Sequence, residues 1–314
     1  HWHDRGDKEK MGVFRFRKFE VRNEKSAMKV NTDGVLLGAL MTITGNERRL
    51  LDIGTGTGTI ALMAAQRLAG MAAAMSRRGK TATPELDVTE PSGLHADAEI
   101  RRPEEGGFMI DAIDIDEASA EEAGENFRDS PWAGQMHAHR CPLSMFRTDE
   151  EYDLIFSNPP FFTETLHSPS ERKAQARHAD ALPTDEIMRF AAARLSEDGK
   201  LSLILPAGRE AEAERAAEEH GLRLTRAVKI RSSERKKAYR AIIEFSRDLG
   251  QTAGELQENV TINMNGKYSE QYLDIVSDFL LIGGPGHEEV RPDRRDDGRQ
   301  AGESAPSGNL PPRP

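Results

Sequence analysis

Four consecutive residues, Asn158-Pro159-Pro160-Phe161, offer the groups that would hold a planar substrate carrying an amino group. They follow the apolar run 152–157, which is short enough to be one buried strand. The two prolines end that strand, because neither can donate to a sheet and each fixes its own φ. An amide, a prolyl carbonyl and an aromatic ring then meet at the edge where open α/β sheets bind ligands. The same residues also suit a proline-terminated strand whose asparagine only caps a turn.

A glycine-rich loop is the second candidate for chemistry. Gly54, Gly56 and Gly58 stand between an apolar strand that ends near Asp52 and a helical segment from residue 59. Glycine is needed where a backbone turns sharply and where a ligand approaches it closely. The Gly-x-Gly-x-Gly spacing differs from the Gly-x-Gly-x-x-Gly of dinucleotide-binding folds. We expect an anion to rest on the helix N-terminus and Asp52 to bind a cationic or hydroxyl group.

Acidic residues end the second predicted strand, 108–116. An acid at this place commonly accepts hydrogen bonds from ribose hydroxyls, and Asp114 is the better placed of the two candidates. Asp116 is expected to cap the helix 117–127 that follows.

A capped helix is also predicted near the N-terminus. Thr32 or Asp33 is expected to be its cap, and residues 35–37 form its apolar face. The N-terminus of such a helix can hold a carboxylate or phosphate, although a helix that only packs has the same pattern.

Metal and disulfide chemistry find little support. His137 and His139 share one face of a predicted third strand, 136–140, but no third ligand is near, so we expect exposed histidines and no metal. The single Cys141 excludes an intramolecular disulfide and a cysteine-rich zinc site, which fits a reducing cytoplasm. No apolar run of about 18 residues exists, so no membrane helix is expected.

The charge is acidic overall and basic in patches. The chain has 53 Asp and Glu against 43 Lys and Arg, yet residues 225–240 contain seven bases and one acid. Because local patches decide contact, global acidity does not exclude nucleic acid, although a basic patch is also often only a solvated face. The candidate RNA-binding residues lie in two basic loops: Arg172, Lys173 and Arg177, and Arg235, Lys236 and Lys237.

The remaining segments alternate between strand and helix. A short strand is expected around Phe14, Phe16 and Phe19, one near 201–206, and an antiparallel pair at 222–230 and 238–245. Helices are expected at 184–195, ending at Gly199, and at 209–220, with a final amphipathic segment at 268–281.

These elements define one domain, 13–282, between a flexible start at 1–12 and a disordered tail at 283–314. Residues 69–107 lose all periodicity and are interpreted as a disordered surface insertion.

Taken together, the alternating elements and the closing antiparallel pair resemble the class I methyltransferases that bind S-adenosylmethionine. The resemblance implies a Rossmann-like α/β fold with a seven-stranded, mostly parallel sheet and an antiparallel C-terminal hairpin. Over about residues 12–282, less the insertion, the chain is closer still to the bacterial tRNA1(Val) (adenine(37)-N6)-methyltransferases. That likeness is carried by Phe14–Phe19, Met28–Leu37, the glycine loop, Ser130–Trp132, Asn158–Phe162, Arg177–Ala179 and Tyr268–Leu281.

The resemblance implies a cytoplasmic enzyme that methylates N6 of the adenine 3′ of the anticodon in valine tRNA. Asn158 and the Pro159 carbonyl would accept hydrogen bonds from the N6 amino group, and Phe161 would stack on the flipped base. S-adenosylmethionine would be bound by Thr32, Asp33, Asp52, Gly54, Gly56, Gly58, Asp114 and Asn158. No membrane partner is implied, and a monomer is favoured.

One departure concerns the cofactor. Related enzymes often place an acid after the third strand, against the cofactor adenine, where this chain has Cys141 or Pro142. Backbone N–H groups near Leu143 could contribute there instead.

Other functions use the same motif. Asn-Pro-Pro with an aromatic residue also serves enzymes that methylate DNA adenine, rRNA guanine-N2 and a glutamine of release factors. No DNA-recognition domain fits in this chain, and only about 45 residues precede the glycine loop, too few for the helical bundle of the glutamine enzymes. The rRNA guanine-N2 enzymes remain a rival, as does an RNA-binding module that binds the cofactor without catalysis.

Overall fold

The protein is described by a computed structural model over residues 12–79, 107–160, 184–247, 250 and 254–281. Nine strands form one sheet in the order β11-β10-β8-β9-β7-β6-β3-β4-β5. They are β3 (Arg49–Ile53), β4 (Met109–Asp114), β5 (Met136–Arg140), β6 (Tyr152–Ser157), β7 (Leu195–Pro206), β8 (Leu222–Ser233), β9 (Ala238–Arg247), β10 (Leu256–Met264) and β11 (Lys267–Tyr268).

Most neighbouring strands in this sheet are parallel. β5, β4, β3, β6 and β7 run in one direction, and β9 is inserted antiparallel between β7 and β8. The predicted mostly parallel sheet with an antiparallel C-terminal pair is therefore confirmed. The predicted count of seven strands is wrong, because β10 pairs parallel with β8 and β11 pairs with β10.

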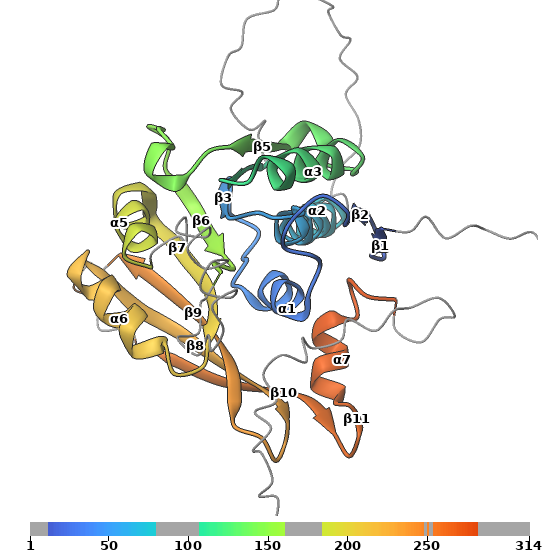
Figure 1. Ribbon diagram of the computed structural model, residues 1–314, viewed down its shortest axis with the longest axis vertical. Coiled ribbons are helices and arrows are strands. Elements are labelled where there is room, and N and C mark those ends of the chain that lie inside the picture. The colour runs from blue at the N-terminus through green and yellow to red at the C-terminus, as the bar shows by residue number, and fades with distance from the viewer. Residues whose placement is uncertain (1–11, 80–106, 161–183, 248–249, 251–253, 282–314) are drawn as a thin grey trace, which may run out of the picture.

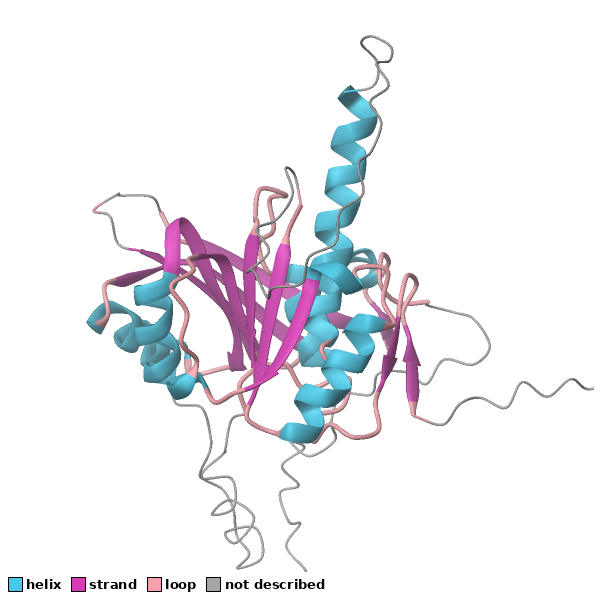
Figure 2. Cartoon of the chain, turned by 90° about the horizontal axis from the view of Figure 1, so that it is seen from above, coloured by secondary structure: helices cyan, strands magenta, loops and turns pink. Residues whose placement is uncertain are grey.

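Helices cover both faces of the sheet, as Figures 1 and 2 show. One face packs on α1 (Thr32–Leu40), α2 (Thr59–Gly79), α3 (Glu117–Arg128) and α7 (Glu270–Val276), and the other on α5 (Thr184–Arg194) and α6 (Glu210–Glu219). Neighbouring strand residues such as Leu50 and Leu51 belong to opposite cores, and both are fully buried. Burial on both faces explains why these strands are continuous apolar runs.

Two boundaries differ from the sequence-based expectation. Residues 69–79, assigned to the insertion, continue α2, and Figure 2 shows this helix projecting from the body. Their alanines and methionines are strong helix formers even without an apolar stripe. Residues 80–106, the rest of the predicted insertion, lie outside the described residues, as do 1–11 and the predicted tail from 283.

The second boundary is at the start of β7. The helix predicted to end at Gly199 ends at Arg194, and Gly199 lies inside β7. Leu195 pairs with Tyr152, and its carbonyl accepts two hydrogen bonds from Arg247, at 2.9 and 2.6 Å. These tertiary contacts draw the chain into the sheet earlier than local propensity indicates.

The N-terminal aromatic segment is a small hairpin rather than one strand. β1 (Val13–Arg15) pairs antiparallel with β2 (Glu20–Arg22), and the turn between them carries Phe16 and Phe19. The two rings stack at 4.5 Å between centroids, and Phe19 meets the edge of Trp132. The hairpin thereby docks beside the end of α3, next to the short 3-10 turn η1 (Ala133–Gln135).

Among the described residues, no helix is both long and apolar enough to cross a membrane.

Candidate active site

Strand register brings the predicted chemical groups to one edge of the sheet. β3 lies between β6 and β4, and Ile53 is opposite both Ser157 and Ile113. The residues that follow these three positions are Asn158, the glycine loop and Asp114, so all three sit at neighbouring carboxyl ends of parallel strands. This edge is where such sheets bind ligands.

The glycine loop has positive φ at all three glycines: 72° at Gly54, 56° at Gly56 and 80° at Gly58. The surroundings of the first and last differ. A Cβ at Gly58 would come within 2.6 Å of the Phe127 ring, whereas a Cβ at Gly54 would meet no described atom within 4 Å. Gly58 therefore allows α2 to pack on α3, and Gly54 faces open space that a ligand can approach.

Asp52 lies beneath this loop and is fully buried. Its Oδ2 accepts a hydrogen bond from the Thr55 hydroxyl at 2.8 Å, while Oδ1 is buried without a hydrogen-bond partner among the described residues. Burial raises the pKa of Asp52 to about 7, opposed by the Thr55 hydroxyl and reinforced by the charge of Asp114. A buried carboxyl with an unused oxygen suits a cationic or hydroxyl-bearing ligand.

Asp114 supports the loop from the end of β4. Its Oδ2 accepts from the Gly56 N–H at 2.9 Å, and its Oδ1 accepts from the Asp116 N–H at 2.9 Å. Burial raises the pKa of Asp114, while these two N–H groups act against the rise. Each oxygen keeps a lone pair for a further donor, as a ribose-binding carboxylate requires.

The neighbours of Asp114 complete this corner. Asp116 caps α3, as predicted, by accepting from the Ser119 N–H at 2.9 Å. Between the two acids, Ile115 is a large apolar side chain left 44% exposed. Sequence reasoning passed over Ile115 because it read the strand only for its acids.

Asn158 is 9% exposed and lies against a segment that sequence reasoning did not connect to it. Its Nδ2 donates to the Met28 sulfur at 3.8 Å, a weak acceptor. The Met28 carbonyl in turn lies 3.5 Å from where a Cβ of Gly56 would be. Residues 23–31 therefore cross from the glycine loop to Asn158 and form one wall of the site.

A buried carboxylate on α3 holds this wall in place. Glu122 is 1% exposed and accepts hydrogen bonds from the backbone N–H groups of Glu24, Lys25 and Ser26, at 2.7 to 2.8 Å. Asn126, one turn further along α3, bonds both the N–H and the carbonyl of Arg22. A glutamate in a charged helical segment gives no sequence signal for such a role.

Helix α1 follows the wall, and its cap differs from the prediction. Asn31 is the N-cap and accepts from the Gly34 N–H at 2.9 Å, so neither Thr32 nor Asp33 caps the helix. Asn, Thr and Asp all have high cap propensity, and only the extended backbone of Asn31 decides among them. Asp33 instead pairs with Arg240 of β9 at 2.7 Å, and Thr32 is buried.

The other end of α1 is fixed by buried charges. Arg226 of β8 donates to the Leu40 carbonyl at 2.6 Å, and Arg67 donates to those of Gly38 and Met41. Cations at a helix C-terminus satisfy its free carbonyls and complement its dipole.

The balancing acid is Glu244, which is 1% exposed. It accepts from the Thr42 N–H and hydroxyl and lies 3.3 Å from Arg226. Together these contacts set the position at which α1 presents its N-terminus to the site.

At the end of β5, where the resemblance leads one to expect an acid, the chain has Cys141 and Pro142. The Cys141 N–H donates to the Asp114 carbonyl at 2.9 Å, and the short 3-10 turn η2 (Leu143–Met145) follows with Leu143 buried. His139 of β5 lies 3.8 Å from Asp111. Among the described residues, no three His, Cys, Asp or Glu side chains are grouped so as to hold a metal ion.

Seven of the predicted site residues are not found at this edge of β6 in the described structure. Phe161 and the basic loop of Arg172, Lys173 and Arg177 lie outside the described residues. The loop of Arg235, Lys236 and Lys237 is exposed at the turn between β8 and β9, three strands from β6 in the sheet order.

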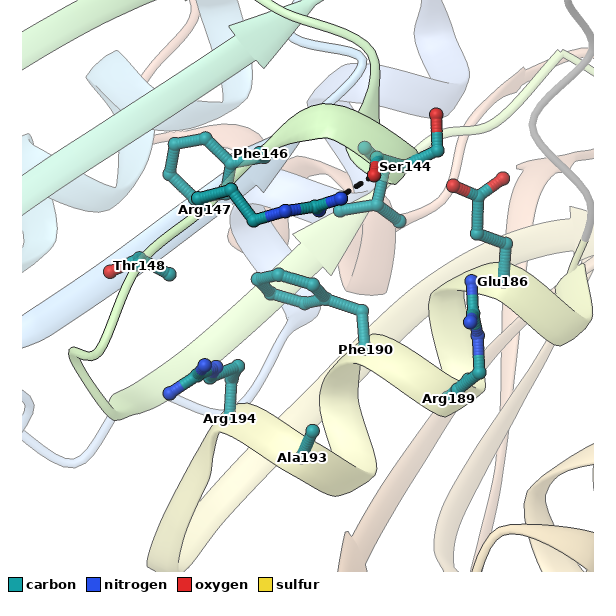
Figure 3. Close-up of a pocket in the computed structure, with 10 residues that line it drawn as sticks. Ser144, Phe146, Arg147, Thr148, Glu186, Arg189, Phe190, Ala193 and Arg194 are labelled. Carbon is teal, nitrogen blue, oxygen red and sulfur yellow. Dashed lines mark hydrogen bonds between the residues drawn. The ribbon is translucent and has the colours of Figure 1, made fainter.

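A separate pocket of about 260 Å³ opens between η2 and α5 (Figure 3). It is lined by Phe146 and Phe190, whose ring centroids are 6.1 Å apart, and by Arg147, Arg189 and Arg194. Its lining includes Leu143, which follows the end of β5, but none of Asp52, Asp114 and Asn158.

Residues 35–238 match the family described as "RMKL-like, methyltransferase domain". A tRNA1(Val) (adenine(37)-N6)-methyltransferase of Flavobacterium johnsoniae is 34% identical over 86% of this chain and 99% of its own length. One from Photobacterium profundum is 32% identical over 85% of this chain and 98% of its own.

Among solved structures, a predicted O-methyltransferase from Agrobacterium tumefaciens aligns with a TM-score of 0.48 and 15% identity, over 79% of this chain and 96% of that one. The sheet order of this chain and its family match together indicate the methyltransferase fold.

Proposed function

This chain belongs to the tRNA1(Val) (adenine(37)-N6)-methyltransferase family, and from that premise we propose how its own residues carry the reaction. It is a class I, S-adenosylmethionine-dependent enzyme that methylates the exocyclic N6 of a tRNA adenine. The names of its relatives do not favour the rRNA guanine or non-catalytic alternatives. The finer proposal is that the substrate is valine tRNA, modified at the adenine 3′ of the anticodon.

The substrate amino group is proposed to bind at Asn158. The amide oxygen of Asn158 and the Pro159 carbonyl accept hydrogen bonds from the two N6 hydrogens, which aims the nitrogen lone pair at the methyl donor. The supporting observation is that this buried amide has only the weak Met28 sulfur as acceptor for its Nδ2 among the described residues. This contact uses the donor nitrogen of the amide, so the oxygen proposed to bind the substrate is not engaged by Met28.

The target base must leave its stack to reach this edge, and Phe161 is proposed to stack on it. Such a contact is worth about 1–3 kcal/mol. S-adenosylmethionine supplies an already activated methyl group. The protein therefore contributes mainly the alignment of nitrogen and methyl carbon, which by itself accounts for large rate factors.

The cofactor is proposed to lie across the glycine loop. Asp114 has free lone pairs for the ribose hydroxyls, Gly54 opens onto free space, and the unpartnered Oδ1 of Asp52 suits the cationic amino-acid end. Thr32, Asp33, Gly56, Gly58 and Asn158 complete the proposed cofactor contacts. Because Asp33 is already paired with Arg240, its proposed contact with the cofactor would have to coexist with that ion pair.

Purified protein incubated with labelled cofactor and tRNA, rRNA or a release factor would test the substrate. We expect label in tRNA, recovered after digestion as N6-methyladenosine next to the anticodon of valine tRNA. Label confined to rRNA or protein would overturn the assignment. Label at another tRNA adenine would overturn only the finer proposal.

A further inference from the structure

Strands β10 and β11 extend the sheet beyond the last residue of the matched methyltransferase domain, Ala238. β10 pairs parallel with β8, so both strands end at the same carboxyl edge as Asn158. The two turns that follow them, 233–237 after β8 and 264–267 after β10, therefore lie at one edge of the sheet. Figure 1 shows β10 and β11 on the side of the sheet away from β5.

Hydrogen bonds join the strand ends that lead into the two turns. Asn263 is in register with Ser233, and its side-chain amide donates to the Ser232 carbonyl at 2.9 Å. Further along the same strands, Arg231 donates to the Asn259 side chain at 3.3 Å. The turns are thus held at a defined spacing.

Helix α7 fixes this extension to the body of the protein. Ser269 caps α7 and also donates to the Thr261 carbonyl, while Gln271 bonds the backbone of Thr261 and Asn259. On its other side α7 packs on α1, and the buried Tyr272 and Val276 belong to the main core. The extension is therefore built as a rigid surface.

The surface it presents is basic. Between residues 229 and 237 five bases accompany one acid, Glu234, and the turn after β10 adds Lys267. Glu270 is the exposed acid nearest in sequence to that turn. We call the six cations the outer ledge: Lys229, Arg231, Arg235, Lys236, Lys237 and Lys267. Arg231 is half-buried and the other five are exposed.

The side chains of the outer ledge suit phosphates rather than bases. The exposed residues of the turn after β10 are Met264, Asn265, Gly266 and Lys267, and none is aromatic. Tyr268 is half-buried with its ring 5.0 Å from that of Tyr272. Cations without stacking rings bind a nucleic-acid backbone and do not read unstacked bases.

The outer ledge also lies at a distance from the catalytic strand. β8 and β10 are three and four strands from β6 in the sheet order. At the usual spacing of about 4.7–4.9 Å between strands, this separates them from the Asn158 strand by roughly 14–20 Å. A nucleotide flipped into the site cannot span this distance, whereas a double-stranded stem next to it can.

We infer that the outer ledge binds the phosphate backbone of the RNA stem that carries the target loop. The inference deepens the proposed function and rests on RNA being the substrate. Double-stranded RNA is recognised mainly through its shape and phosphates, which matches a rigid row of cations. The methyltransferase domain then supplies chemistry, and the appended strands select a nucleotide that has a stem beside it.

The test compares two RNAs: a stem-loop with the target adenine in its loop, and a short single strand with only the loop sequence. Lys229, Arg231 and Lys267 would be replaced together by Ala, and dissociation constants measured at several salt concentrations. We expect stem-loop binding to weaken about tenfold and the log–log salt slope to fall by about 2–3, since each of the three phosphate contacts contributes about 0.7–0.9. Binding of the short strand should change less than about twofold. For the stem-loop KM should rise while kcat at saturation is unchanged.

A matched control removes three exposed arginines that lie outside β8, β10 and the turns after them, Arg48→Ala, Arg128→Ala and Arg215→Ala, for the same change in charge. Equal losses in both triple variants, or equal losses for both RNAs, would overturn the inference. Lys267→Glu alone, in an exposed turn, is the second variant if the triple replacement unfolds. If Lys267→Glu binds the stem-loop as tightly as the wild type does, that result would also count against the outer ledge. The dissociation constants are measured in the absence of methyl transfer. A lack of methylation would therefore reject the proposed function, while the binding comparison would still test the outer ledge.

Discussion

The β3–β4–β5 half of the sheet and the β8–β9–β10 part present polar groups to the same edge by different means. In the first, buried carboxylates bind backbone N–H groups: Glu122 holds residues 24–26, and Asp114 holds Gly56. In the second, cations extend into solvent from strand ends and turns. A small ligand of fixed shape is best met by a preorganised backbone, whereas a long polyanion is best met by many weak, screened contacts. The difference suggests that cofactor affinity depends on geometry and RNA affinity on charge.

Replacing Asn158 is expected to have the largest effect, because this residue lies where the two regions meet. Asn158→Ala should lower kcat by about 10²–10³-fold, as for loss of one positioned hydrogen-bonding group in a transition state. Cofactor affinity, measured by calorimetry, should fall much less than kcat, because Asn158 is only one of several proposed cofactor contacts. Unchanged turnover would mean that the active site has been misplaced.

The two glycines provide a sharper contrast within the cofactor region. Gly58→Ala should lower the free energy of unfolding by about 1–3 kcal/mol, because its Cβ would clash with Phe127 at 2.6 Å. Gly54→Ala introduces a similar backbone strain at positive φ but no clash. We therefore expect it to weaken cofactor binding more than it lowers the free energy of unfolding. Denaturant unfolding with and without cofactor separates the two. If both variants changed the free energy of unfolding and the cofactor dissociation constant to the same extent, Gly54 and Gly58 would not have the different roles assigned to them.

Asp52 predicts a pH dependence. Its pKa of about 7 in the folded protein is above that of an unfolded carboxyl, so the folded state binds the proton more tightly. The free energy of unfolding should therefore fall as pH rises from about 4 to 7, by up to about 1.4 kcal/mol per unit, and level off above 7.

Binding of a cationic group favours the ionised form, so cofactor affinity should rise toward pH 7, by at most about tenfold per unit. Calorimetry across this range would measure both trends, and Asp52→Asn is the control that should flatten them. A wild-type affinity independent of pH would exclude Asp52 as the partner of the cation.

Neutralising Arg235, Lys236 and Lys237 should have the smallest effect on turnover. Binding of tRNA should weaken several-fold and become less sensitive to salt, while cofactor affinity stays unchanged. Filter binding at two salt concentrations would show this. Equal salt dependence in variant and wild type would place the RNA surface elsewhere.

Sequence reasoning succeeded where chemistry and local pattern coincide. The glycine loop, Asp116 as a cap and the β8–β9 pair have signals in residue type or spacing. Asn31 was missed because two equally good cap residues follow it. Glu122 was missed because a glutamate on a charged helix looks solvated until a distant backbone segment reaches it. β10 was passed over although Val260, Ile262 and Met264 alternate, since its other face is polar and is left uncovered by a helix.

Gln271 has a consequence for the behaviour of the protein in solution. A strand near the rim of a sheet exposes backbone groups on which another chain can add and begin aggregation. Here the Gln271 amide accepts from the Thr261 N–H and donates to the Asn259 carbonyl, on β10 at the rim of the sheet. One side chain thus takes the place of a neighbouring strand, so the rim beside the outer ledge is less able to recruit a second copy of the protein.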